Sequence, residues 1–292
     1  MTWLDILILC MVILGVVCLV SIWHASTHFH KVFYRLSSDK ISKPVKFVLL
    51  SDLHDRTYGV HNEKLLKAIE TEQADAILVA GDMLTPTKDR KKEAEALIQK
   101  LAERYPVFYG LGNHEAKMGW SKERFGNRQE EYLADVTREK VHILRNTYAS
   151  FGDEVHIYGL DLPHEYYKRF DRFPMEEQYM ESLLGEADRQ YFNVLIAHNP
   201  AYFDHYANWK PDLVVSGHVH GGLVRLPFWG GVIAPNLQLF PKYDGGKFKE
   251  KDTTMILSRG LGFHSIEFRM WNPGELVVIE VIPTGGFYGD TC

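Results

Sequence analysis

Five short phrases rich in Asp, His, Asn and Gly carry the residue types of a metal site. They are Asp52-Leu53-His54, Gly81-Asp82, Gly112-Asn113-His114-Glu115, Ala197-His198-Asn199 and Gly217-His218-Val219-His220. Carboxylate, imidazole and amide oxygen together suit Mn, Fe or Zn better than a metal that prefers thiolate. Taken singly, each phrase has an ordinary explanation as a turn, a helix cap or a half-exposed strand. Together, and in this order, they favour a metal centre.

The spacing within the phrases indicates how ions would be held. Asp52 and His54 are two residues apart, so on an extended segment both side chains face the same side and can hold one ion. His218 and His220 have the same spacing. Asp82 has two carboxylate oxygens and can bridge two ions. The remaining candidates are one amide oxygen and one imidazole, from Asn113 and His198.

Each phrase directly follows an apolar run that predicts a buried strand. These runs cover residues 45–50, 76–80, 106–109, 192–197 and 213–216. Ligands bind outside the carboxyl ends of strands in open α/β sheets, so we expect the five phrases to meet at one edge. Further strands are predicted over 155–160, 255–258 and 276–282, and helices over 62–71, 89–105, 127–139 and 175–188. This alternation favours a layered α/β fold, with mostly loop over 217–246.

The N-terminus begins with an uncharged apolar run from Ile6 to Trp23. Its length is close to the ~20 residues that span the hydrocarbon of a bilayer. A cleaved signal peptide would have a positive start and a small-residue cleavage site, whereas Asp5 precedes this run and no such site follows it. A lipid-modified Cys18 is a further alternative. We expect a retained single-pass anchor.

The expected domain organisation is an anchor over 1–24, a juxtamembrane linker over 25–44 and a catalytic domain over 45–292. Basic residues follow the apolar run and none precedes it; they are Lys31, Arg35, Lys40, Lys43 and Lys46. Positive residues close to a span tend to remain in the cytoplasm, which predicts a cytoplasmic catalytic domain beside the membrane. That position would suit a lipid-linked phosphate, and soluble esters stay open.

Composition narrows the class of protein. Hydrophobic residues make up 46% and charged residues 24% of the 292-residue chain, which suits a full globular core. The net charge of −5 gives no basic footprint, so no nucleic-acid partner is expected. The stretch between Cys18 and Cys292 contains no cysteine, which excludes a disulfide framework.

The five phrases resemble the pattern of the calcineurin-like metallophosphoesterase superfamily: D-x-H, G-D, G-N-H-[DE], H and G-H-x-H. The resemblance runs from about residue 46 to 282. The sequence is also similar to a membrane-anchored bacterial branch, through GHVHGGLVRLP at 217–227 and SRGLG at 258–262. It departs from that branch at Leu223, where a polar residue is usual.

The resemblance implies a two-sheet β-sandwich flanked by helices. It implies that a first ion is held by Asp52, His54, Asp82 and His220, and a second by Asp82, Asn113, His198 and His218. It places His114 near the site without binding metal.

The implied reaction is hydrolysis of a phosphomonoester or phosphodiester by a hydroxide that bridges the two ions. His114 is the candidate to stabilise the phosphoryl charge or to protonate the leaving oxygen. Glu115 or Asp52 would orient the imidazoles. Arg225 and Arg259 are candidates to contact the substrate phosphate, or else form surface ion pairs. A metal-binding scaffold without turnover, a nuclease and a protein phosphatase are the alternative functions.

Overall fold

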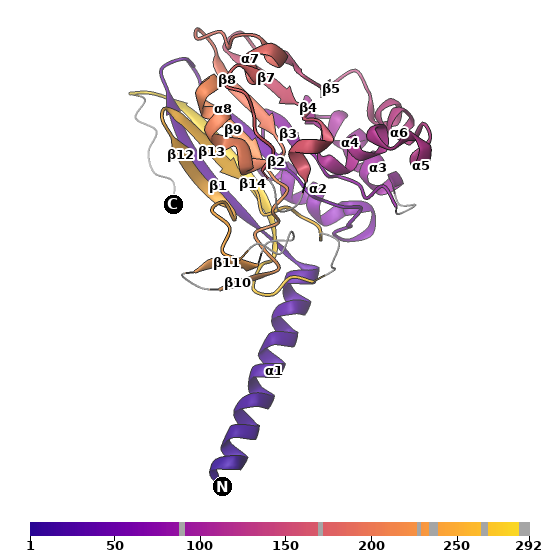
Figure 1. The fold of residues 1–292 in the computed structure, drawn as a ribbon, viewed down its shortest axis with the longest axis vertical. Coiled ribbons are helices and arrows are strands. Elements are labelled where there is room, and N and C mark those ends of the chain that lie inside the picture. The colour runs from indigo at the N-terminus through magenta and orange to yellow at the C-terminus, as the bar shows by residue number, and fades with distance from the viewer. Residues whose placement is uncertain (88–90, 169–171, 227–228, 234–238, 264–267, 286–292) are drawn as a thin grey trace.

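The computed structural model describes residues 1–87, 91–168, 172–226, 229–233, 239–263 and 268–285. Two six-stranded sheets lie face to face (Figure 1). The first has the order β1 (Phe29–Ser38), β14 (Gly274–Pro283), β2 (Val45–Leu50), β3 (Ala76–Ala80), β4 (Val107–Gly110) and β5 (Val141–Leu144). The second has the order β12 (Gly246–Glu250), β13 (Thr253–Leu257), β9 (Leu213–Ser216), β8 (Phe192–Ala197), β7 (Val155–Leu160) and β6 (Thr147–Phe151).

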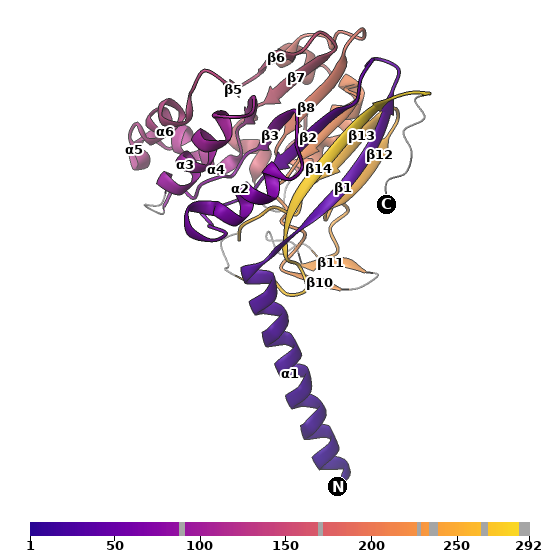
Figure 2. The ribbon, with the colours of Figure 1, turned by 180° about the vertical axis from the view of Figure 1, so that it is seen from behind.

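Helices cover the outer face of each sheet, so the domain has four layers. The first sheet is covered by α2 (Glu63–Glu70), α3 (Lys91–Ala102), α4 (Asn113–Trp120), α5 (Lys122–Phe125) and α6 (Arg128–Val136). The second is covered by α7 (Tyr179–Leu184) and α8 (Phe203–Trp209). The view from behind shows the same layering (Figure 2). The expected two-sheet fold flanked by helices is confirmed.

Apolar residues alternate between two cores along the central strands. In β2, Phe47 and Leu49 enter the core between the sheets, whereas Val48 and Leu50 enter the core beneath the helices. A strand buried on both faces needs apolar residues at every position, because successive side chains point to opposite faces. This explains why the central strands could be recognised from continuous apolar runs.

The predicted strands 45–50, 76–80, 155–160, 192–197 and 213–216 are found with these bounds. The helices are shorter than predicted: α7 covers only part of 175–188, and residues 89 and 90 of the predicted helix 89–105 lie outside the described residues. The region 217–246 was predicted as mostly loop. It contains an antiparallel hairpin of β10 (Val224–Leu226) and β11 (Gly230–Ile233).

The juxtamembrane linker expected over 25–44 is wrong for most of its length. Residues 29–38 form β1, which pairs in parallel with β14 along all ten residues. Three basic residues of this stretch form ion pairs within the domain: Lys31 with Glu72, Arg35 with Glu280, and Lys40 with Asp212. The error arose because β1 alternates exposed and half-buried positions at a sheet edge and lacks an apolar run.

The N-terminal helix α1 (Trp3–Thr27) extends away from the sandwich as a single rod (Figure 1). It is long and apolar enough to cross a membrane, and its most apolar window is not buried by the domain. A signal sequence near the N-terminus has the same properties. Only His28 separates α1 from β1, so no flexible segment joins the helix to the domain.

The position of β1 predicts where a stable fragment begins. A chain starting at residue 40 lacks β1, so Tyr34 and Leu36 no longer pack against the core between the sheets. We expect it to be less stable than a chain starting at residue 28 by ~2 kcal/mol or more, the scale of uncovering one or two large apolar side chains. Urea unfolding of the two fragments measures the difference. Equal unfolding free energies would show that β1 contributes nothing to the fold.

Candidate metal centre

The five phrases meet at one end of the sandwich. Three follow β2, β3 and β4 of the first sheet, and two follow β8 and β9 of the second. Backbone hydrogen bonds continue between the loops beyond the strand ends: the Asp52 N–H donates to the Gly81 carbonyl at 2.9 Å, and the His54 N–H to the Asp82 carbonyl at 3.1 Å. The edge predicted from the sequence is therefore shared between two sheets.

Five of the seven candidate ligands lie in the left-handed region of backbone conformation. Their φ angles are +51° at Asp52, +49° at His54, +55° at Asp82, +75° at His218 and +54° at His220. This region is uncommon for residues other than glycine, although Asp and His enter it more readily than most. Such strain persists only where the surrounding structure enforces it, and it concentrates at functional sites. The left-handed conformation turns these five side chains toward a common point.

Two glycines are required by the close approach of these loops. Gly81 has φ +80°, and a Cβ there would lie 2.1 Å from the Gly112 nitrogen. A Cβ at Gly217 would lie 2.2 Å from Asp52 Oδ2. Both contacts are far below van der Waals separation, so any side chain at either position would push the ligand loops apart.

The candidate ligand atoms gather into overlapping groups. His220 Nε2 lies 3.2 Å from His54 Nε2 and 3.3 Å from Asp52 Oδ1. Within the described residues, Asp52, His54 and His220 offer ligand atoms within 4.8 Å of one another, and so do Asp82, His198 and His218. Each of these two groups is part of one of the two ligand sets that the resemblance implies, whereas a third group, His54, Asp82 and His114, includes a residue outside those sets.

The protonation of His198 tests whether the site suits a cation. Its Nδ1 lies 2.5 Å from the Ala80 carbonyl, so Nδ1 carries the proton and donates it. In the neutral ring the lone pair of Nε2 then faces Asp82 Oδ2, 3.2 Å away. Two electron-rich atoms at this distance repel each other unless a positive charge lies beside both. Despite burial, the negative charge of Asp82 raises the pKa of His198 to about 10. The raised pKa shows that the metal-free site favours positive charge at this ring.

The two carboxylates are withdrawn from water. Asp52 and Asp82 have 0% and 1% of their surface exposed. Burial raises the pKa of Asp52 to about 6, because the charged form loses its hydration. Burial acts on Asp82 in the same direction, but His198 and His114 nearby hold the pKa of Asp82 well below its ordinary value. A buried carboxylate pair of this kind requires compensating positive charge.

The amide of Asn113 also fits an ion. Its Oδ1 is buried and finds no hydrogen-bond partner among the residues that the structure describes. A buried acceptor without a donor is costly, and a metal ion would satisfy it. Asn113 is the first residue of α4 and Gly112 is the N-cap, so the alternative in which Asn113 caps the helix is wrong.

Glu115 supports the site in a different way from that expected. It was predicted to orient imidazoles, but its carboxylate accepts the backbone N–H groups of Asp82, Met83 and Gly112 at 2.8, 2.7 and 3.0 Å. The Tyr109 hydroxyl also donates to it, at 2.9 Å. Burial raises the pKa of Glu115 to about 7. Glu115 thereby joins the loop after β3 to the start of α4.

His114 lies beside the first group of ligands. Its ring meets that of His54 edge to face at 4.6 Å, and its Nε2 is 4.0 Å from Asp82 Oδ2. Its side chain is 17% exposed, and burial lowers its pKa. His114, His54 and Asp82 offer ligand atoms within 4.8 Å of one another. His114 is therefore close enough to touch a group bound at the ions.

The two candidate substrate arginines are engaged elsewhere. Arg225 Nη1 lies 3.0 Å from Asp244 Oδ2 and also donates to the Asp244 carbonyl. Arg259 forms an ion pair with Glu275 and contacts His30. These are the ion pairs left open by the sequence, although partly buried rather than on the surface. A direct contact with substrate stays a prediction for both.

Three residues around the site were missed by sequence reasoning. Arg269 is buried, and its Nη2 lies 3.1 Å from His220 Nδ1. The side-chain amide of Asn272 donates to the carbonyls of His220 and Gly222 at 2.7 and 2.8 Å. The Tyr167 ring meets the His218 ring edge to face at 5.5 Å. None lies in a motif, so only the fold reveals them.

A model of the calcineurin-like phosphoesterase family matches residues 45–222, and the chain belongs to this family of metal-dependent hydrolases. It is 27% identical over 256 residues to an uncharacterized metallophosphoesterase of Helicobacter pylori strain J99, covering 84% of this chain and 62% of that protein. It is 25% identical to the uncharacterized metallophosphoesterase YkuE of Bacillus subtilis, covering 82% and 79% of the two chains.

The chain thus spans less than two thirds of the length of the Helicobacter relative. Among solved structures, TT1561 of Thermus thermophilus aligns with a TM-score of 0.45 at 14% identity, covering 75% of this chain and 91% of that one. Family membership and the His/Asp clusters together define a metallophosphoesterase with a metal-binding site.

The bonds of Glu115 generate a test of how the site is held. In Glu115→Gln, one carboxylate oxygen becomes an NH₂ group, which must face a backbone N–H of Asp82, Met83 or Gly112. An unsatisfied buried donor costs ~1–3 kcal/mol, so we expect the unfolding free energy of the metal-free protein to fall by that amount.

We also expect weaker metal binding by this variant, because the loop after β3 carries Asp82. Urea unfolding and titration with Mn²⁺ measure the two effects. Glu103→Gln is the control: it makes the same substitution at an exposed position and should change neither the unfolding free energy nor metal binding. Unaltered stability of Glu115→Gln would contradict the bracing role.

Proposed function

We propose that the chain is a membrane-anchored metallophosphoesterase that hydrolyses a phosphomonoester or phosphodiester with two divalent ions, of which Mn, Fe and Zn are the candidates. One observation carries the proposal: buried carboxylate, imidazole and amide groups from five strand ends converge, with Nε2 of His198 directed at Asp82. Such an arrangement is unfavourable without cations.

The proposed ligand assignment follows the two groups of atoms. Asp52, His54, Asp82 and His220 would hold the first ion, and Asp82, Asn113, His198 and His218 the second. Asp82 takes part in both because its side chain lies between His54 and His198, at 3.8 and 3.2 Å from their Nε2 atoms. The donor set of nitrogen and oxygen atoms suits the proposed metals.

Bound ions would supply positive charge against the phosphoryl oxygens and lower the pKa of an attacking water. The chain's own residues supply position and protons. The Asp52 carboxylate accepts the His218 backbone N–H at 3.0 Å, which fixes the G-H-x-H loop against the first sheet. His114 can carry a proton to the leaving oxygen, since an imidazole exchanges protons near neutral pH. Burial lowers the pKa of His114, which weakens its hold on that proton.

The helix α1 supports a place at the membrane. Its length and composition fit a retained anchor, as in the membrane-anchored bacterial branch that the sequence resembles. The basic residues after the span, and their absence before it, favour a cytoplasmic domain. A lipid-linked phosphate ester would then be within reach of the site, and the net charge of −5 disfavours a nucleic-acid substrate.

Metal content tests the assignment of Asp82. Wild-type protein supplied with Mn²⁺ is expected to hold about two ions per chain and to hydrolyse members of a phosphate-ester panel. Asp82→Ala should lose both ions, because both groups of ligands share this carboxylate, whereas His220→Ala should lose mainly one. Elemental analysis measures the ions, and His61→Ala, with a largely exposed side chain, is the control. An Asp82→Ala protein that retains two ions would refute the shared ligand.

The role of His114 is separated from metal binding by measuring both. His114→Ala should keep about two ions while turnover falls by ~10²-fold or more, as for a lost acid–base group. Turnover is followed under saturating Mn²⁺, with ion content measured on the same samples. If the ion content falls together with turnover, His114 is a ligand; if turnover persists, it has no catalytic role.

A further inference from the structure

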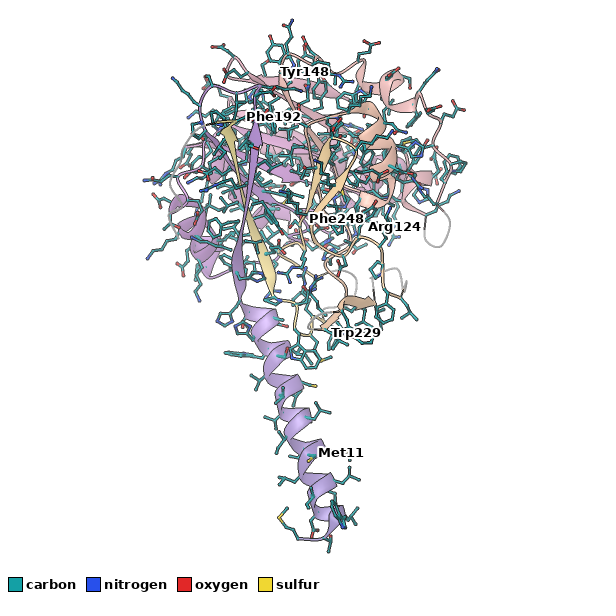
Figure 3. The ribbon with its side chains drawn as sticks, turned by 90° about the vertical axis from the view of Figure 1, so that its left-hand side faces the viewer. Met11, Arg124, Tyr148, Phe192, Trp229 and Phe248 are labelled. Carbon is teal, nitrogen blue, oxygen red and sulfur yellow. The ribbon has the colours of Figure 1, made fainter. Side chains whose placement is uncertain are left out.

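The end of the domain beside α1 carries large exposed apolar side chains. Trp229, Leu239 and Phe240 are exposed by 71%, 63% and 54%, and together they form what we call the hairpin surface. The rings of Trp229 and Phe240 lie 6.4 Å apart. Figure 3 shows Trp229 at the α1 end of the domain and Tyr148 at the opposite end. Exposed apolar side chains gathered in this way mark an interaction site.

The hairpin surface is one unit with the segment before Trp271. The Phe240 N–H donates to the Val232 carbonyl of β11 at 2.9 Å. On the other side of the hairpin, the Arg225 N–H donates to the Met270 carbonyl at 3.1 Å, and the Met270 N–H to the Leu223 carbonyl at 3.0 Å. These hydrogen bonds therefore fix the position of the hairpin relative to the loop at Trp271.

The same loop touches α1 inside its apolar run. The Trp271 N–H donates to Ser21 Oγ at 2.9 Å. Ser21 lies two residues before Trp23, the end of the run, which is about 3 Å along the helix axis. A groove of about 590 Å³ continues from there down to Val16, lined by Val20, Trp271 and Pro273 among others. A bilayer that covers α1 up to Trp23 would also reach Trp271.

The connection between α1 and the domain leaves no slack to avoid this contact. His28 alone separates the helix from β1, and β1 is paired with β14 along its whole length. The charges on this side also suit a membrane. Of the two charged residues within 217–243, Arg225 is paired with Asp244, and Lys242 is basic and exposed. Basic residues near a surface of anionic lipid are attracted to it.

We propose that the hairpin surface and Trp271 enter the interface of the bilayer that α1 crosses, as a second membrane contact. The inference rests on the anchoring part of the proposed function. Trp side chains are enriched at this depth because their amphipathic ring lies at the headgroup level, and Phe and Leu enter the boundary between headgroups and acyl chains. We assign lipid as the occupant of the hairpin surface, because this surface lies at the α1 end of the domain, where the apolar run of α1 would enter the bilayer.

This contact has a direct link to the metal centre. Only three residues separate His220 from the start of β10, so the hairpin directly continues the G-H-x-H loop. Asn272, the neighbour of Trp271, holds the carbonyls of His220 and Gly222. One side of each segment thus faces the membrane and the other supports a metal ligand. The contact would hold this edge of the site at the bilayer, where the headgroup of a lipid phosphate ester lies.

Fluorescence of the full chain in vesicles tests the contact. The protein is reconstituted in phosphatidylcholine–phosphatidylglycerol vesicles, with or without bromine near the headgroup end of the acyl chains. The emission of Trp229 is obtained as the difference between wild type and Trp229→Phe. We expect bromine to quench this emission by at least half, and aqueous iodide to have little effect on it.

Tyr148→Trp is the matched control, because Tyr148 is 50% exposed at the end of the domain away from α1. Its added emission should respond to iodide and not to bromine. If Trp229 behaves like this control while the chain stays with the vesicles after an alkaline wash, the second contact is overturned and the anchor stands. If the chain is released by the wash, the anchor and the contact both fall.

Discussion

Two carboxylates withdrawn from water, Asp52 and Asp82, impose the condition on which the metal centre depends. Burial of a charge is unfavourable unless an opposite charge lies nearby. The imidazoles of His54, His198 and His220 surround these two carboxylates. Without ions, a second proton on His198 supplies part of the compensation: its Nδ1 donates to a carbonyl, and its raised pKa favours a proton on the Nε2 that faces Asp82 as well. The site becomes favourable when cations lie among these groups.

The two-sheet architecture makes this concentration of polar groups possible. A single sheet would present the loops in a row, with outer loops far apart. Here the loops after β2, β3 and β4 face those after β8 and β9 across the core between the sheets. The central strands β2 and β3 are apolar on both faces, so the candidate ligands lie at the end where these strands stop. Strain in the left-handed backbone of five ligands is sustained by this rigid frame.

The structure also joins the metal centre to α1, the proposed membrane anchor. The G-H-x-H loop passes into the β10–β11 hairpin, and the segment at 269–272 contacts His220 on one side and α1 on the other. A flexible linker would have allowed the metal centre and α1 to move independently. The parallel pairing of β1 with β14 removes that freedom, so the orientation of the domain relative to α1 is set by the fold.

Much of the site was predictable because its residues are local in the sequence. A D-x-H or G-H-x-H phrase after an apolar run combines ligand chemistry with a strand end, and both are visible without coordinates. The central strands could also be predicted from the sequence, because burial on both faces requires apolar residues at each position. The apolar character of α1 was visible as an uncharged run of nearly the length that spans a bilayer. These features depend on residue type and short spacing alone.

Other features depend on contacts between residues far apart in the chain, which short patterns do not record. β1 lacks an apolar run because it lies at a sheet edge, and its pairing with β14 joins residues about 245 positions apart. Glu115 acts on the backbone of Asp82, a contact that its phrase does not announce. Arg269 and Asn272 belong to no motif. Sequence alone therefore identified the candidate groups for chemistry, whereas the tertiary structure decided which residues brace them and how the site lies relative to α1.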